Sequence, residues 1–200
     1  MQPELDILKE LGNMAAGHGG TALSEILGRR IDLEVPVVDI ITCENLSKTR
    51  LEGENVMVIS SKILTGLKGE VVFFLKEKEA FKLVDLSAKA KEILSGKKTY
   101  VFTEAGISLI KEIGSVAICS YLSTLGLFLK KVIVPSFPIL LSGSFDEILE
   151  ITLSFYKKEE DYAYLIETIF KVEDDEGRGS FYFILPPQTA SSLTQACKEI

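Results

Sequence analysis

The sequence is poor in the residues on which metal sites, disulfide scaffolds and long membrane spans depend. It contains one histidine, His18, and three widely separated cysteines, Cys43, Cys119 and Cys197. A single histidine with no cysteine at ligand spacing argues against a metal site, and nothing around it supplies the nucleophile elbow of a serine hydrolase. An odd number of separated cysteines fits unpaired thiols in a reducing cytosol. We expect Cys119, on a long apolar helix, to pack in the core.

Basic residues are scarcer than acidic ones. The net charge of -7 and the pI near 4.9 argue against nucleic acid and anionic membrane surfaces and favour a protein partner. No basic segment followed by an apolar one opens the chain, so we expect no export signal and a cytoplasmic location. The longest uncharged run, residues 113–129, is short for a membrane span and contains serine, threonine and glycine. It predicts a buried core helix and no membrane span.

The apolar content of 46% over 200 residues is enough for the core of a single domain spanning residues 1–200. Helical spacing of apolar residues predicts a long helix from near Pro3 to Leu27. Alternation of β-branched residues predicts a strand over residues 31–43, with Pro36 at an edge position or a bulge. The same patterns predict two strands over residues 55–64 and 69–75, joined around Gly66, and a helix over residues 77–94.

The same succession then begins again. A second long helix is predicted over residues 103–129, with Thr103 as its N-cap. The remaining predicted elements are a proline-containing strand over 132–141, a short helix over 144–151, two strands over 162–172 and 180–185 around an acidic hairpin, and a closing helix over 188–200.

An offset of 102 residues superimposes the two halves. It places "KELG" (Lys9–Gly12) on "KEIG" (Lys111–Gly114), and "GEVVFFL" at 69–75 later lies over "GSFYFIL" at 179–185 with the offset grown to 110. We assign the extra residues to the acidic hairpin. A period of about 100 residues is too long for a solenoid. We therefore expect repeats at approximately 3–95 and 103–200 in an internally duplicated, pseudo-twofold α+β domain, with a mostly antiparallel central sheet flanked by two long homologous helices.

Four glycines interrupt the first predicted helix within "KELGNMAAGHGG", Lys9 to Gly20. Each costs about 1 kcal/mol relative to alanine in a helix interior. Asp6, Glu10 and Asn13 share one helix face, and the next residues on that face are small. Two explanations stay open, and both can hold: bare backbone lets another surface approach the polar face closely, or it lets the two repeat helices pack together.

These residues carry a family resemblance. The spacing Asp6-x3-Glu10-x2-Asn13-x22-Pro36 resembles the signature of the CheC, CheX and FliY phosphatases of prokaryotic chemotaxis, and "KELGNMAAGHGGTALSEILGRRIDLEVP" is similar to the CheC form almost throughout. CheX, with one motif, is a poorer match than CheC, which is a tandem duplication of about this length. The second half carries the same spacing, with serine in place of asparagine, at Ser108, Glu112, Ser115 and Pro138.

The resemblance implies a phosphatase for the phospho-aspartate of a CheY-type response regulator. It assigns Asn13 to orient the attacking water and Glu10 to hold a lysine of the regulator. The Mg²⁺ is expected in the regulator's acidic pocket, so the chain needs no cofactor or metal of its own. Glu112 and Ser115 would form a degenerate second site, nearly silent because a serine hydroxyl reaches less far than an amide. The supporting motif positions are Asp6, Ser108, Pro36 and Pro138.

A second interpretation remains beside the enzyme. The chain could instead be an adaptor that binds CheD, the receptor deamidase that partners CheC in the family, or a component of the flagellar switch. Release of phosphate from a phosphorylated regulator separates the two. We expect a monomer, because internal duplication already supplies the pairing that a dimer would give, and we expect Glu10 and Asn13 to be exposed side by side.

Overall fold

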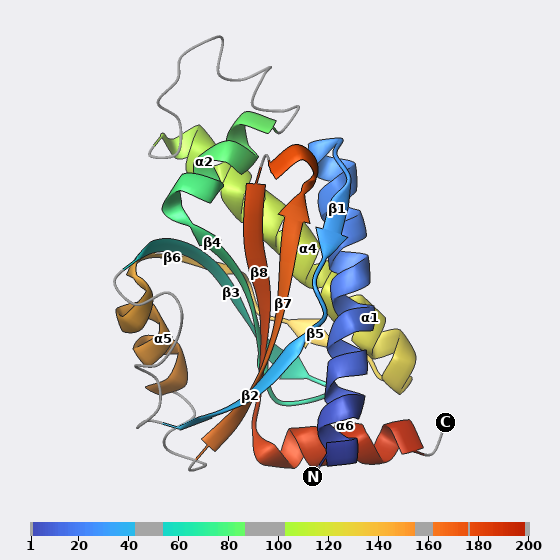
Figure 1. Ribbon diagram of the computed structural model, residues 1–200. Helices are drawn as coiled ribbons and strands as arrows, with labels where there is room; N and C mark the ends of the chain where they lie inside the picture. The colour runs from blue at the N-terminus through green and yellow to red at the C-terminus, as the bar shows by residue number, and fades with distance from the viewer. Residues whose placement is uncertain (1, 43–53, 87–102, 155–161, 176, 199–200) are drawn as a thin grey trace.

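The computed structural model describes residues 2–42, 54–86, 103–154, 162–175 and 177–198 (Figure 1). The first half contains α1 (Gln2–Leu27), β1 (Ile31–Leu33), β2 (Val37–Thr42), β3 (Asn55–Thr65), β4 (Glu70–Lys76) and α2 (Glu77–Leu86). The second half contains α4 (Glu104–Leu129), β5 (Val134–Pro135), β6 (Ile139–Ser144), α5 (Phe145–Ser154), β7 (Tyr162–Val172), the 3₁₀ turn η2 (Glu173–Asp175), β8 (Gly177–Leu185) and α6 (Pro187–Lys198). The mixture of helices and antiparallel strands confirms the expected α+β fold.

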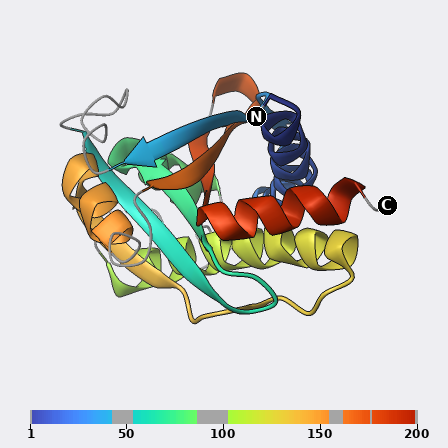
Figure 2. The same cartoon turned by 90° about the horizontal axis from the view of Figure 1, so that it is seen from below.

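The strands form one antiparallel sheet with the order β1-β7-β8-β4-β3-β5, in which β2 also pairs with β7 and β6 with β3. The hairpins β3–β4 and β7–β8 occupy its centre. The long helices α1 and α4 cover one face, and α5 lies on the other (Figure 1). Seen from below, α6 lies between α1 and α4 (Figure 2).

The arrangement of the strands is symmetric. Exchanging each first-half strand with its second-half counterpart returns the same strand order in reverse. The registers obey the same exchange, because Val37 pairs with Glu167 where Ile139 pairs with Ser60. This pseudo-twofold pattern agrees with the predicted repeats, whose common origin stays a prediction. The α5 helix stands between β6 and β7, so the extra length of the second half does not lie in the acidic hairpin alone.

A continuous apolar core fills the space between the long helices and the sheet. Its centre contains the stacked rings of Phe73 and Phe170, whose centroids lie 5.4 Å apart. The predicted N-cap of α4 is confirmed, because the Thr103 hydroxyl accepts a hydrogen bond from the Gly106 backbone N–H at 3.1 Å. By length and composition alone α4 could cross a membrane. Here one side of α4 is buried against α1 and the sheet.

Three predictions need correction or delimitation. The single strands predicted over 31–43 and 132–141 are each split where a proline, Pro36 or Pro138, lacks the N–H needed to continue the ladder. Cys119 is exposed, not buried, because a helix that is apolar on nearly every side does not reveal from sequence which side faces solvent. Cys43 and the predicted helical residues beyond Leu86 lie outside the described residues.

Candidate functional site

Two of the four glycines in α1, Gly12 and Gly19, allow close packing inside the molecule. A Cβ atom at Gly12 would lie 2.6 Å from the Ile166 Cγ2 atom on β7, and one at Gly19 would lie 2.9 Å from the Phe181 ring on β8. A Cβ atom at Gly20 would make ordinary contacts at 3.5 Å with side chains of β1. Gly12 and Gly19 therefore let α1 lie closer to the sheet than any larger residue would allow.

Gly19 also brings the two long helices together. Its Cβ position lies 3.4 Å from the backbone oxygen of Ala117 in α4. One residue earlier, the His18 carbonyl accepts a hydrogen bond from the Ser120 hydroxyl of α4 at 3.0 Å. His18 and Ser120 are equivalent under the 102-residue offset, so the helices contact one another at matching positions. The packing explanation for the glycines is therefore supported at this point of the helix.

Gly17 differs from the other three. Within the described part of the chain, a Cβ atom at Gly17 would meet no atom within 4 Å outside the adjacent helix backbone. Its φ is not positive either, since the positive-φ glycines among the described residues are Gly28, Gly66 and Gly69. Neither packing nor backbone conformation explains a glycine here. Gly17 lies one turn from Asn13, on the face that carries the polar stripe.

The polar stripe of α1 is exposed as predicted. Asp6, Glu10 and Asn13 all face solvent, while Leu8 and Leu11 between them are buried. Within the described residues, neither the Glu10 carboxylate nor the Asn13 amide has a hydrogen-bond partner. An exposed carboxylate and amide on a rigid helix are free to bind groups that another molecule presents.

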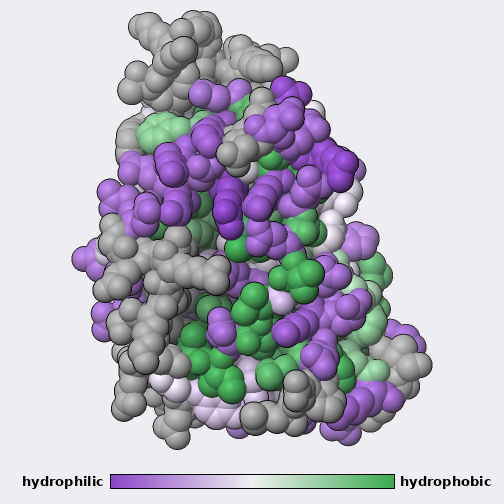
Figure 3. All heavy atoms as spheres, in the orientation of Figure 1, coloured by the Kyte–Doolittle hydropathy of each residue, from purple (hydrophilic) through white to green (hydrophobic). Residues whose placement is uncertain are grey.

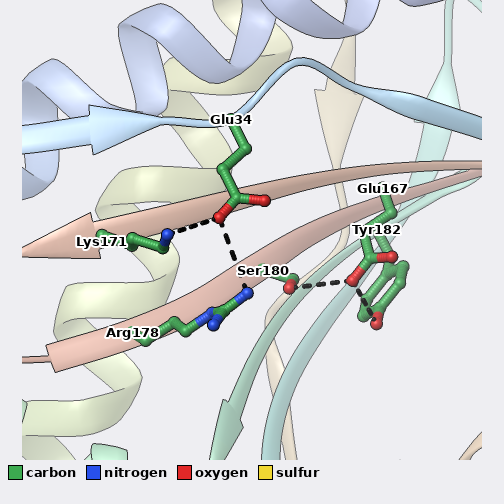
Figure 4. Close-up of polar contacts among 6 residues, drawn as sticks. All are labelled: Glu34, Glu167, Lys171, Arg178, Ser180 and Tyr182. Carbon is green, nitrogen blue, oxygen red and sulfur yellow. Dashed lines mark hydrogen bonds and ion pairs between the residues drawn. The ribbon is translucent and has the colours of Figure 1, made fainter. Parts of the chain in front are cut away.

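The loop that carries Pro36 is fixed beside this stripe. Pro36 is buried, and its ring lies 3.7 Å from the Cβ position of Gly12. Two residues earlier, the Glu34 backbone N–H donates to the Ile169 carbonyl at 2.9 Å. The Glu34 carboxylate pairs with Lys171 at 2.7 Å and Arg178 at 3.7 Å (Figure 4). These contacts, which the sequence pattern did not indicate, tie the loop to β7 and β8.

Apolar side chains are exposed on α1 and on either side of Pro36. Met14 on α1 is 37% exposed, and Val35 and Val37, on either side of Pro36, are 82% and 51% exposed. Apolar side chains gather over β2, next to α1 (Figure 3). Apolar side chains beside a few polar groups are typical of the centre of a protein–protein interface. The sequence alternation did not predict that these valines are exposed, because a valine in an edge strand is usually expected to face the core.

The opposite face of the sheet carries a different polar cluster. The Glu167 carboxylate accepts hydrogen bonds from the Ser180 hydroxyl at 3.1 Å and the Tyr182 hydroxyl at 2.9 Å (Figure 4). Burial, with a smaller contribution from the Glu167 charge, raises the pKa of Tyr182 well above its ordinary value. The cavity beside it, between the sheet and α5, measures only about 20 Å³ and is lined by apolar groups. This cluster satisfies buried polar groups and leaves no room for a substrate.

The second half keeps part of the motif. Ser108 and Glu112 are exposed, as their counterparts on α1 are. Ser115 is half-buried, and its hydroxyl donates to the Lys111 carbonyl of its own helix. Cys119 is exposed at the position equivalent to Gly17. The second site therefore keeps the carboxylate but presents no amide, and it has a side chain where the first site has bare backbone.

The second proline loop is held by the same backbone contact as the first. The Ser136 N–H donates to the Lys62 carbonyl at 2.7 Å, where Glu34 donates to Ile169 in the first half. Pro138 is only half-buried, and neighbouring Phe137 is 95% exposed. Among the described residues, no group of three or more histidine, cysteine or acidic side chains could hold a metal ion.

Comparisons with known proteins include the segment that carries the first site. The sequence profile of the CheC-like family matches residues 4–40, from α1 to β2. The CheY-P phosphatase CheC of Bacillus subtilis (strain 168) is 25% identical over 193 residues, which cover 92% of this chain and 88% of the relative. Residues 4–40 contain Asp6, Glu10, Asn13 and Pro36.

Solved structures share the fold. The crystal structure of Thermotoga maritima FliY superimposes with a TM-score of 0.74 at 23% identity, covering 98% of this chain and 96% of FliY. The FliM middle domain from H. pylori gives a TM-score of 0.62 at 14% identity, covering 98% and 99% of the two chains. At these identities the likeness shows a common fold and no more, and differently named proteins share this fold.

Proposed function

We propose that the chain is a phosphatase acting on the phospho-aspartate of a CheY-type response regulator in chemotaxis signalling, because its residues 4–40 match the CheC-like family and the CheY-P phosphatase CheC of Bacillus subtilis is 25% identical over 193 residues. The observation that supports this most is the exposed pair of Glu10 and Asn13 beside the open backbone at Gly17. These side chains have no structural partner within the described residues, and they lie in the segment that matches the family. An unpartnered amide on a rigid helix is suited to positioning a water molecule.

Asn13 acts by orientation. Its amide oxygen accepts a hydrogen bond from the attacking water, and its NH₂ group donates to the phosphoryl group or its surroundings. The water oxygen forms a bond to phosphorus as the bond between phosphorus and the aspartyl oxygen breaks in line with it. The products are a free aspartate carboxylate and inorganic phosphate, which carries away the oxygen and both protons of the water. Asn13 is not consumed, and positioning is the main contribution that phosphoryl transfer needs from it.

Glu10 acts in docking. Its exposed carboxylate accepts a charge-assisted hydrogen bond from a lysine ammonium on the regulator. Met14, which is exposed one turn from Glu10 on the same helix, is covered at the same time and helps to exclude water around the pair. The Mg²⁺ that would neutralise the phosphoryl charge is expected in the acidic pocket of the regulator.

An adaptor is the second candidate. The shared architecture with the FliM middle domain and the strongly exposed Phe137 favour a surface that binds without turnover. In that case a flagellar-switch component or CheD would occupy the apolar loops, and Glu10 and Asn13 would only hold a partner. The two candidates differ in whether the bound regulator loses its phosphoryl group.

Phosphate release from a phosphorylated regulator tests the proposal. CheY labelled with radioactive phosphate is incubated alone and with substoichiometric protein, and inorganic phosphate is measured over time. We expect decay to accelerate with many turnovers per protein molecule, and this acceleration should disappear when the protein is heat-denatured. A stable complex with phosphorylated CheY that leaves its decay rate unchanged would establish the adaptor and exclude the phosphatase.

A further inference from the structure

We infer that Gly17 is a specificity-determining residue, whose missing side chain gives the phosphorylated receiver domain the clearance it needs to reach Asn13. This inference rests on the proposed phosphatase function and adds a residue to it. The first argument is that the fold does not need this glycine. The described chain offers no atom within 4 Å of its Cβ position beyond the helix backbone, and its φ is not positive.

The position of Gly17 gives the second argument. Residues at i and i+4 lie above one another on a helix, so the bare backbone at Gly17 borders Asn13, and Glu10 lies on the same face. The Gly17 carbonyl accepts a hydrogen bond from the Thr21 hydroxyl at 3.0 Å, so the next turn on this side is already fixed. A partner loop that places its phosphoryl group on the Asn13 amide must pass close over Gly17. A larger residue would hold that loop away.

The second half of the chain supplies a natural comparison. At the equivalent position of α4 stands Cys119, whose side chain is exposed. One turn earlier, the Ser115 hydroxyl bonds to the backbone of its own helix. The second half, which lacks the asparagine amide, therefore also lacks the open space beside it, because Cys119 has a side chain there. The two features occur together in the first half and are both missing from the second, as expected if they serve one docking event.

The competing explanation is that the glycine is a neutral surface position. A glycine in an exposed helix interior destabilises the fold, so replacing it with alanine should stabilise the protein. If Gly17 has no role in docking, that gain should come without any loss of activity. Clearance for a partner predicts the opposite combination, with higher stability and weaker function in the same variant.

The experiment compares Gly17→Ala and Gly17→Leu with a matched control, Cys119→Leu, which places the same side chain at the equivalent exposed position of α4. Three quantities are measured for each protein: the melting temperature, the Kd for CheY loaded with beryllofluoride as a phosphoryl mimic, and phosphate release from phosphorylated CheY. For Gly17→Ala we expect the melting temperature to rise by roughly 1–4 °C. Its phosphate release should fall about tenfold, because even a partial displacement of the partner from the amide is costly.

For Gly17→Leu we expect phosphate release to fall on the order of 100-fold, as for a misplacement of about 1 Å, together with a weaker Kd. Cys119→Leu should match the wild type in both. Three results would overturn the inference. They are phosphate release at the wild-type rate by either Gly17 variant, a loss of phosphate release in Cys119→Leu equal to that in Gly17→Leu, and a lower melting temperature in Gly17→Ala. Failure of the proposed function shows itself separately, because the wild-type protein would then not release phosphate; the Kd comparison would still show whether Gly17 governs docking.

Discussion

Glu10 and Asn13 lie three residues apart on one exposed face of α1, but their expected roles differ. A carboxylate can hold a cation, whereas an amide can donate and accept at the same time. Neither has a partner within the described residues, so their chemistry is available to a bound protein. At this scale, docking and hydrolysis should be separable by single substitutions.

Glu10→Gln tests the docking role. The substitution keeps the shape of the side chain but removes its charge, so the lysine of the regulator loses a charge-assisted hydrogen bond. We expect the Kd for beryllofluoride-loaded CheY to weaken about tenfold, equivalent to about 1.4 kcal/mol, with a smaller effect on turnover at saturating regulator. Glu112→Gln, the equivalent change on α4, is the control and should leave turnover unchanged, because the second face lacks the amide. An unaltered Kd in Glu10→Gln would remove Glu10 from docking.

At the scale of the element, α1 is defined by what its glycines contact. Gly12 and Gly114 occupy equivalent positions, and their Cβ positions lie 2.6 Å from Ile166 and 2.9 Å from Ile59. Each long helix therefore packs through a glycine on the hairpin of the other half, α1 on β7–β8 and α4 on β3–β4. Gly17, by contrast, faces open space. Substitutions within one helix should have opposite effects on stability.

Gly12→Ala should destabilise the fold. The added methyl group overlaps the Ile166 side chain, and overpacking of this kind costs about 1–3 kcal/mol. We expect the melting temperature to fall by roughly 2 °C or more, and Gly114→Ala should behave in the same way. Thermal melting of both variants beside Gly17→Ala measures the contrast. A Gly12→Ala protein that melts above the wild type would show that the helix can shift away from β7.

The second helix tests which features a working site needs. In an Asn13→Ala background, Ser115→Asn restores an amide to α4, and Cys119→Gly also removes the side chain beside it. We expect a small gain in phosphate release from Ser115→Asn alone and a larger gain when both changes are combined, because the regulator must first approach closely. If Asn13→Ala retains substantial activity that Ser115→Ala abolishes, serine would be a competent substitute for asparagine. No gain from the combined change would mean that the second face has lost its docking surface as well.

The periodicity of the sequence predicted most elements, because the helices bury one side, and the central strands stand out as short apolar runs buried on both sides. It located α1, α4 and the central hairpins, and the prolines marked where the edge strands break. It misplaced Cys119 because α4 is apolar on nearly all sides, so which side faces solvent depends on packing against α1 and the sheet. It could not separate Gly17 from Gly12, since the difference is a contact that Gly12 makes with Ile166 on β7, far away in the sequence.

The candidate site was predictable for a different reason. Polar side chains at helical spacing among apolar neighbours indicate an exposed stripe, and the family resemblance named the residues. The supporting contacts of Glu34 with Lys171 and Arg178 join segments far apart in the chain and leave no local pattern. The exposed rim around Pro36 was hidden for the same reason, because only the sheet edge shows that Val35 and Val37 face outward.

At the scale of the whole molecule, a pseudo-twofold arrangement offers two related faces, and the chain has made them different. The first face keeps the carboxylate, the amide and the open glycine, whereas the second keeps only the carboxylate, and its proline loop carries the strongly exposed Phe137. A symmetric fold does not require two working sites. The proposed activity therefore depends on the first face, and removal of its amide should silence most of the protein.

Asn13→Ala is the most direct test of this conclusion, measured as phosphate release from phosphorylated CheY together with thermal melting and the Kd for beryllofluoride-loaded CheY. Orientation of the attacking water is worth about 2–4 kcal/mol by comparison with other positioned hydrogen-bonding groups. We expect release to fall by about 30- to 1000-fold, while the melting temperature and the Kd stay close to those of the wild type. An Asn13→Ala protein that is folded, binds CheY and releases phosphate at the wild-type rate would contradict the proposed role of Asn13.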